Sequence, residues 1–101
     1  MLDMIKTKIA GISLHQNIIS EIVPGEELLL MREPDNRFDT NAIIVLSRSK
    51  KQLGYVNRNL AFDVAKAMDE GVVVKCFASM ITGAGYSLKG VNIEIRVGVA
   101  A

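Results

Sequence analysis

The sequence predicts a mainly β domain with one principal α-helix, arranged as a small, partly open β-barrel. Three observations predict this class: short segments with strand-like patterns, turn-forming residues between them, and one long apolar stripe with helical spacing. Half of the 101 residues are apolar, which suits a packed core and is too much for a disordered tail. The length fits a single domain, 1–101, without room for a second core.

The first half of the chain contains most of the expected strands. Lys6 and Lys8 alternate with neighbouring Thr and Ile, so residues 6–12 are expected to form the first strand. Residues 16–22 are ambiguous, and the spacing of their isoleucines favours one helical turn over the core. Pro24-Gly25 predicts a turn. Beyond it we expect a strand at 27–32, consecutive turns at 34–41, a strand apolar on both faces at 42–46, a polar hairpin loop at 47–51 and its partner strand at 52–56.

One helix is clear in the second half, from Asn57 to Glu70. Asn57 is a good N-cap and Gly71 a good stop. Between them runs one apolar stripe: Leu60, Ala61, Val64, Ala65 and Met68. Strands are expected at 72–82 and 91–97, the latter alternating cleanly between apolar and polar residues. Six short strands and one such helix are typical of the small barrels related to the SH3 and OB folds.

The charge of the chain is nearly balanced. Twelve basic and 11 acidic residues give a formal net charge of +1, which argues against a protein that grips long stretches of duplex through many phosphates. A small site with a few basic groups remains open. Because no segment has a basic amphipathic face, an apolar run of bilayer length or the basic start of a signal peptide, we expect a cytoplasmic protein that does not act at a membrane.

The residue types needed for common catalytic and metal sites are scarce. His15 is the only histidine and Cys76 the only cysteine, so a zinc site or a Ser-His-acid set has almost no basis. The loop 83–85 is glycine-rich but lacks the Lys and the following helix of a phosphate-binding loop. The apolar surroundings of Cys76 predict a buried, unreactive thiol. We therefore expect neither catalysis nor a metal or cofactor.

Two segments resemble the signature of the HIRAN domain family. The first, Met31 to Ile43, has an Arg-Glu-Pro lead, an Asn, an aromatic-Asp pair and an Asn-Ala-Ile exit into a strand. The second, Leu53 to Ala61, resembles the family's Gly-Tyr…Arg…Leu-Ala segment, with Asn57 in place of the usual Pro. The resemblance covers roughly residues 10–97. It implies an OB-like barrel that binds DNA without cofactor or reaction, and in helicase-like transcription factors the domain captures single-stranded DNA by its 3′ end.

The resemblance also implies roles for particular residues. Phe38 and Asp39 match the aromatic-acid pair that packs on the terminal nucleotide and accepts a hydrogen bond from its 3′ hydroxyl. Tyr55 matches a position beside the DNA. Arg58 matches a residue that contacts phosphate. Arg58 also opposes the dipole at the start of the helix, and this misfit favours a functional role.

The residues themselves leave alternatives open. Phe38 is as well suited to anchor its loop to the core as to stack on a base. Asp39 and Asn36 suit backbone turns, and either could also meet the nucleic acid. Arg32 suits an ion pair with a neighbouring acid or a phosphate contact. Tyr55 suits the interior of the barrel or a second stacking surface.

One departure from the family bears on function. The DNA-binding members carry an Arg-Tyr pair in the first strand, where this chain has Thr7 and Lys8. That change and the near-neutral charge favour an alternative function: a protein-interaction module that recruits a helicase, a nuclease or another DNA-processing enzyme in a bacterial or phage system. Tyr86, after the glycine-rich loop, is a further residue that could reach the site.

Overall fold

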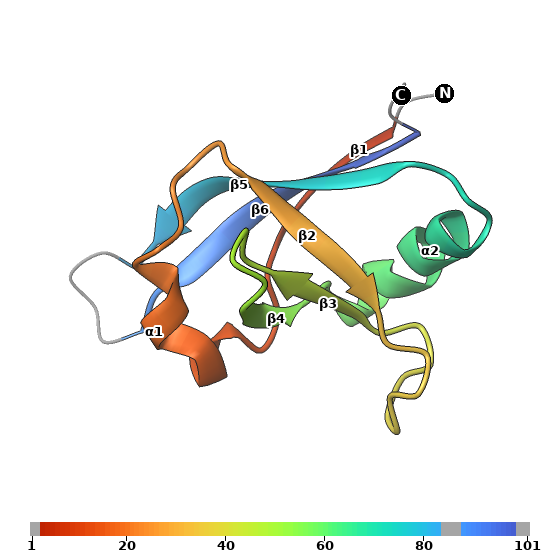
Figure 1. Ribbon diagram of the computed structural model, residues 1–101, viewed down its shortest axis with the longest axis horizontal. Helices are drawn as coiled ribbons and strands as arrows, with labels where there is room; N and C mark the ends of the chain where they lie inside the picture. Colours follow the sequence, from red (N-terminus) through yellow and green to blue (C-terminus); the bar gives the residue numbers. More distant parts are fainter. Residues whose placement is uncertain (1–2, 84–87, 99–101) are drawn as a thin grey trace.

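Strands form one curved antiparallel sheet, and helical segments pack against it (Figure 1). The computed structural model describes residues 3–83 and 88–98. Within them the elements are, in chain order, β1 (Asp3–Lys8), the 3-10 helix η1 (Ile12–His15), α1 (Gln16–Ile19), β2 (Glu27–Arg32), β3 (Ile43–Leu46), β4 (Gln52–Tyr55), α2 (Arg58–Asp69), β5 (Val74–Thr82) and β6 (Gly90–Val97). The strand order is β1-β6-β5-β2-β3-β4. This is the partly open, mainly β barrel that the sequence predicts.

The barrel closes where the segment that follows β1 crosses β4, at Ala10 and Tyr55. Ile9 continues the pairing of β1 with β6 by donating its backbone N–H to the Val91 carbonyl at 3.0 Å. Ala10 and Tyr55 then exchange two backbone hydrogen bonds of 2.8 Å. Gly54 lies under this crossing, where a Cβ atom would collide with the Ala10 carbonyl and the Ile9 side chain. The first segment and β4 can therefore approach only because residue 54 has no side chain.

The core lies inside the barrel and under the helices. Val91, Ile93 and Ile95 alternate along β6 and are fully buried, as their sequence pattern predicts. Other large, fully buried side chains come from the remaining sheet and from α2: Leu28, Ile43, Val45, Leu53, Val64 and Cys76. The expected helical turn near residues 16–22 is confirmed as α1. Its buried isoleucines cover one end of this core.

The principal helix is confirmed with its cap and its stop. The Asn57 side chain accepts a hydrogen bond from the Asn59 N–H at 2.8 Å, and Gly71 has a left-handed φ of 83°. Val64 is buried, whereas Leu60 and Met68 at the two ends of the stripe are only partly buried. Burial along the stripe is therefore less uniform than the sequence spacing predicts.

The first strand differs from its predicted bounds. It spans Asp3–Lys8 rather than 6–12. Gly11, with φ of 70°, turns the chain into η1, whose first residue, Ile12, the prediction had placed in the strand. The predicted alternation is correct, since Lys6 and Lys8 are exposed and Ile9 is buried. In the part of the chain that the structure describes, no helix is long and apolar enough to cross a membrane.

Candidate functional site

The loop between β2 and β3 is built from two turns held by side chains. Asn36 Oδ1 accepts hydrogen bonds from the backbone N–H groups of Phe38 at 2.9 Å and Asp39 at 3.0 Å. Asp39 Oδ1 accepts one from the Asn41 N–H at 2.9 Å. The turn-forming roles predicted for Asn36 and Asp39 are therefore confirmed. Asp39 Oδ2 accepts no hydrogen bond from the described residues, so this oxygen is available to a ligand.

Arg32 holds this loop from behind. Its guanidinium donates to both carboxylate oxygens of Asp69, at 2.9 and 3.2 Å, and to the carbonyls of Ala42 at 2.9 Å and Thr40 at 3.1 Å. The side chain is only 18% exposed. The expected ion pair exists, but its partner comes from the end of α2 rather than from the neighbouring Glu33. The phosphate contact expected for Arg32 stays a prediction.

Glu33 joins the loop to the barrel wall. Its Oε1 accepts hydrogen bonds from Asn36 Nδ2 at 2.6 Å and from the Tyr55 hydroxyl at 3.1 Å. Partial burial of Tyr55 and the adjacent carboxylate raise the pKa of its hydroxyl, which therefore remains a donor. From the sequence, Glu33 is expected only as a candidate ion-pair neighbour of Arg32. The position of Glu33, between the end of β2 and the following turn, is the sequence feature that could have indicated its role in holding the loop.

Five of the six predicted site residues line one groove of about 380 Å³. They come from the loop, β4 and the start of α2: Asn36, Phe38, Asp39, Tyr55 and Arg58. Arg32, behind the loop, is not in the groove wall. Ala10, Ala42 and Val56 supply the apolar part of the lining. The barrel crossing at Ala10 and Tyr55 therefore forms one wall of the groove.

Phe38 and Arg58 are the most exposed predicted residues of this groove. Phe38 is 85% exposed, so it does not anchor the loop to the core. Arg58 donates one hydrogen bond to the Phe38 carbonyl at 3.1 Å and is otherwise exposed. Three residues that carry an aromatic ring, a carboxylate and a guanidinium thus line one groove. Such a set can stack on a planar group, accept a hydrogen bond and bind an anion.

The two first-strand positions at which this chain departs from the DNA-binding members lie elsewhere. Lys8 is exposed on β1, two residues before the Ala10 crossing, and Thr7 is partly buried on the opposite face. Neither lines the groove. Tyr86 lies outside the described residues.

Comparison with known proteins identifies the family. The HIRAN domain family matches residues 2–97. The fold is similar to that of the HIRAN domain of human HLTF, with a TM-score of 0.75 and 22% identity over 93% of this chain and 74% of that one. It is also similar to a protein from Lactobacillus plantarum, with a TM-score of 0.78 and 20% identity over 96% of this chain and 97% of that one.

Among curated protein sequences, none matches this chain significantly. At identities of 22% and 20%, the two structural similarities establish the fold. The family match covers nearly the whole chain and includes both sequence segments that carry the resemblance. The chain belongs to the HIRAN domain family.

Proposed function

We propose that this domain is a non-catalytic DNA-binding module whose groove receives the free 3′ end of a single strand. DNA binding is the function known for HIRAN domains, and this family membership supports the general proposal. One observation carries the more specific part. Phe38, which is exposed, lines the same groove as Asp39 and Arg58.

Phe38 supplies a surface for the terminal base. Stacking on an aromatic side chain is worth about 1–3 kcal/mol per base and tolerates every base, because every base has a π face. The ring is fully available, since its backbone rather than its side chain is held by Asn36 and Arg58. A Phe38→Ala variant should therefore weaken binding to all single strands.

Asp39 distinguishes the end of a strand from its interior. A carboxylate repels each phosphate that approaches it, but a terminal 3′ hydroxyl can donate a charge-assisted hydrogen bond to it. A 3′ phosphate, or a strand that continues past this point, places an anion there instead. Attraction of the correct end and repulsion of the wrong end act together. Because Oδ1 already holds the turn, Oδ2 is the oxygen proposed for the hydroxyl.

The test compares labelled single strands of one sequence that end in a 3′ hydroxyl, end in a 3′ phosphate, or are circular. We expect the hydroxyl end to bind most tightly, with a preference on the order of tenfold, the value of one hydrogen bond to a charged group. Asp39→Asn should shrink this preference more than it lowers affinity for the circular strand. Asp35→Asn, an exposed acid of the same loop outside the groove, is the matched control.

Each variant must keep the melting temperature of the wild type, because Asp39 also holds its turn. Equal wild-type affinity for the three strands would exclude 3′-end recognition while leaving DNA binding in place. No salt-sensitive binding to any single strand would exclude the proposed function altogether.

A protein-interaction role is the second candidate, and one observation favours it. The groove lining contains one cation, Arg58, and one acid, Asp39, so the groove is nearly neutral. A helicase or nuclease partner would suit such a surface better than a long nucleic acid would. Absence of single-strand binding, together with capture of such an enzyme through Phe38, would favour this candidate.

A further inference from the structure

We propose that the free edge of β1 and the cleft between β1 and α2 form a second binding surface, which takes an extended segment of a partner protein as an added β-strand. The segment alternates apolar and acidic residues and carries a Lys or Arg at its ends. This surface and the proposed DNA groove have no lining residue in common.

The hydrogen-bond pattern identifies the free edge. In an antiparallel strand the backbone groups of successive residues point to alternate edges. Ile9 donates to β6, so the odd-numbered residues of β1 face β6, whereas Ala10 faces the other way and pairs with Tyr55. Met4, Lys6 and Lys8 share the orientation of Ala10. Within the described residues, their backbone N–H and C=O groups have no strand beside them.

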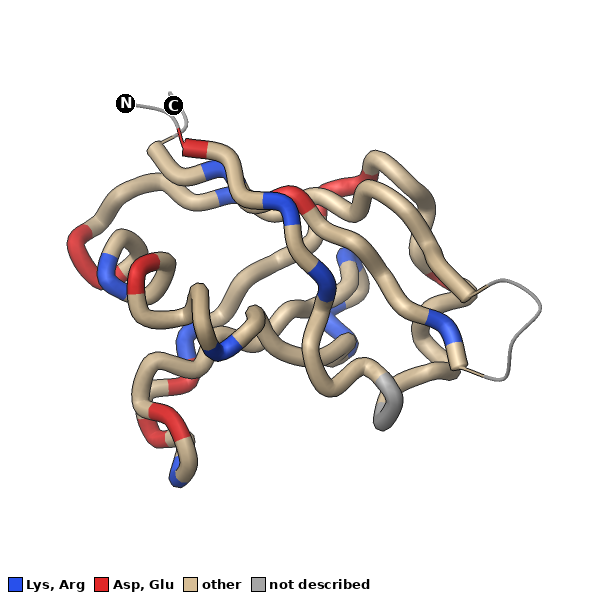
Figure 2. Tube along the Cα trace, turned by 180° about the vertical axis from the view of Figure 1, so that it is seen from behind, with Lys and Arg blue, Asp and Glu red and all other residues tan. Residues whose placement is uncertain are grey.

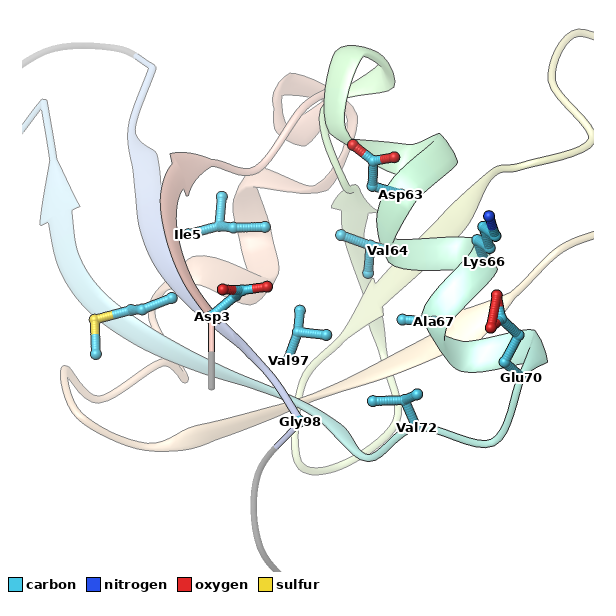
Figure 3. Close-up of a pocket in the computed structure, with 11 residues that line it drawn as sticks. Asp3, Ile5, Asp63, Val64, Lys66, Ala67, Glu70, Val72, Val97 and Gly98 are labelled. Atoms are coloured by element: carbon cyan, nitrogen blue, oxygen red, sulfur yellow. The ribbon is translucent and has the colours of Figure 1, made fainter. Parts of the chain in front are cut away.

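A cleft of about 670 Å³ lies next to this edge, between β1, the end of β6 and α2 (Figure 3). Its volume falls within the range of about 300–1,000 Å³ that is typical of ligand pockets. Its apolar lining includes Ile5, Val64, Ala67, Val72 and Val97. A strand added beside β1 would lie about 4.8 Å from it and would place every second side chain over this apolar surface.

The charges around the cleft define the partner. Asp3, Asp63 and Glu70 line it together with a single cation, Lys66, so basic residues at the ends of a segment would be attracted. A nucleic acid would instead place phosphates against three carboxylates. Basic residues lie along β1 (Figure 2). Lys6 and Lys8 are exposed there and favour acidic residues on the outward positions of the added strand.

A second copy of this chain fits the edge poorly. Two β1 strands paired antiparallel through their free edges would bring Lys6 and Lys8 of one copy against those of the other, and opposed like charges destabilise such pairs. Lysine on an edge strand is a common protection against self-association. The lysines therefore disfavour pairing with β1 of a second copy and leave the backbone groups of the edge available to an acidic segment.

The first test uses synthetic peptides of about eight residues, enough for a typical strand. Val or Ile alternates with Glu, and Arg stands at each end; a control peptide has Lys in place of Glu and Asp in place of Arg. Two further versions of the first peptide are N-methylated on alternate residues, each version blocking one edge. We expect the unmodified peptide to bind, one methylated version to retain its affinity, and the other to lose about tenfold or more.

Amide exchange supplies the structural readout. On addition of the peptide, exchange of the Met4, Lys6 and Lys8 amides should slow, while the Ile5 and Thr7 amides, already paired with β6, should change little. Lys6→Pro should abolish binding by removing one outward N–H, and proline is tolerated on an edge; Lys6→Ala, which keeps the N–H, is its matched control. Ala67→Trp should also block binding by filling the cleft.

Several results would overturn the proposal. These are no binding by any apolar-Glu peptide, equal affinity of the two methylated versions, or tighter binding of the Lys control. Slow exchange of the three outward amides before peptide is added would show that the edge is already covered. Dependence of that protection on protein concentration would indicate a second copy, and independence would indicate another part of this chain. None of these results affects the DNA proposal, because the groove does not share a lining residue with the cleft.

Discussion

Arg32 and Glu33 determine the shape of the groove without lining it. Arg32 ties the loop to Asp69 of α2, and Glu33 ties it to Tyr55 of β4. These two contacts position the loop that carries the exposed Phe38 and the partly buried Asp39. At the scale of single residues, the groove therefore depends on polar contacts made behind the groove wall.

The two arginines should respond differently to substitution. Arg58→Ala should weaken single-strand binding several-fold and make the slope of log K against log salt shallower by about 0.7, the value for one phosphate contact on a single strand. If Arg32 only holds the loop, Arg32→Met should weaken binding by loosening the loop and leave the slope unchanged. Titrations at several salt concentrations measure both. A shallower slope for Arg32→Met would instead support its direct contact with phosphate.

Cys76 should be inert while the protein is folded. Burial, with a smaller contribution from Glu27, raises the pKa of its thiol from 9.0 to about 12. Because the folded state holds the proton more tightly, this stabilising contribution is complete below pH 9 and is lost as the pH rises toward 12. The full loss is on the order of 4 kcal/mol.

Urea unfolding at pH 8 and pH 10.5 should show about half of this loss in the wild type and a smaller change in Cys76→Ala. Alkylation by iodoacetamide at pH 8 should be negligible until the protein unfolds. Rapid alkylation of the folded protein, or equal alkaline sensitivity of the two proteins, would contradict the prediction.

Helix α2 links the two surfaces at the scale of elements. Arg58 at its start lines the groove, whereas Lys66 and Glu70, near and just past its end, line the cleft. Its inner face is fixed to the core by Ala61, Val64 and Ala65. A change in the packing of this face would therefore disturb both surfaces.

Val64→Ala should lower the free energy of unfolding by about 1–3 kcal/mol, because it removes two buried carbon atoms and leaves a cavity. Phe62→Ala is the matched control on the same helix. Phe62 is 60% exposed, so its loss should change stability by no more than about 0.5 kcal/mol. Chemical denaturation of both variants measures the difference, and equal effects would contradict the assigned inner face.

The elements with complete local patterns could be predicted from the sequence. Strand β6 alternates cleanly, and α2 has a cap, a stripe and a stop, so both were predicted within a residue or two. The predicted bounds of β1 were wrong because Ala10, Gly11 and Ile12 continue the apolar pattern of the strand. Only the left-handed conformation of Gly11, which the structure reveals, shows where the extended segment ends. In the site, too, local features could be predicted and contacts between distant residues could not. Local turns at Asn36 and Asp39 were predictable, whereas the Arg32–Asp69 pair joins residues 37 positions apart and depends on the fold.

At the scale of the whole molecule, closure of the barrel depends on the absence of a side chain at Gly54. Gly54→Ala should destabilise the protein by about 1–3 kcal/mol, as expected for overpacking, because the added methyl meets the Ala10 carbonyl. The hydrogen bonds between Ala10 and Tyr55 should open first. Amide exchange of these two residues should accelerate more than that of Ile93 in the centre of the sheet. Unchanged exchange at the crossing would contradict this role of Gly54.

The pairing of Asp3 with Val97 brings the two ends of the described chain together, away from the 33–42 loop (Figure 1). A domain with adjacent ends can be inserted into a surface loop of another protein without stretching either chain. Such a host chain would enter beside Asp3 and leave beside Gly98, both at the cleft. Its own flanking segments would then reach the free edge of β1 at a high effective concentration. Insertion would thus convert the proposed strand-addition site into an intramolecular connection, while the proposed DNA groove lies at the other end of the domain.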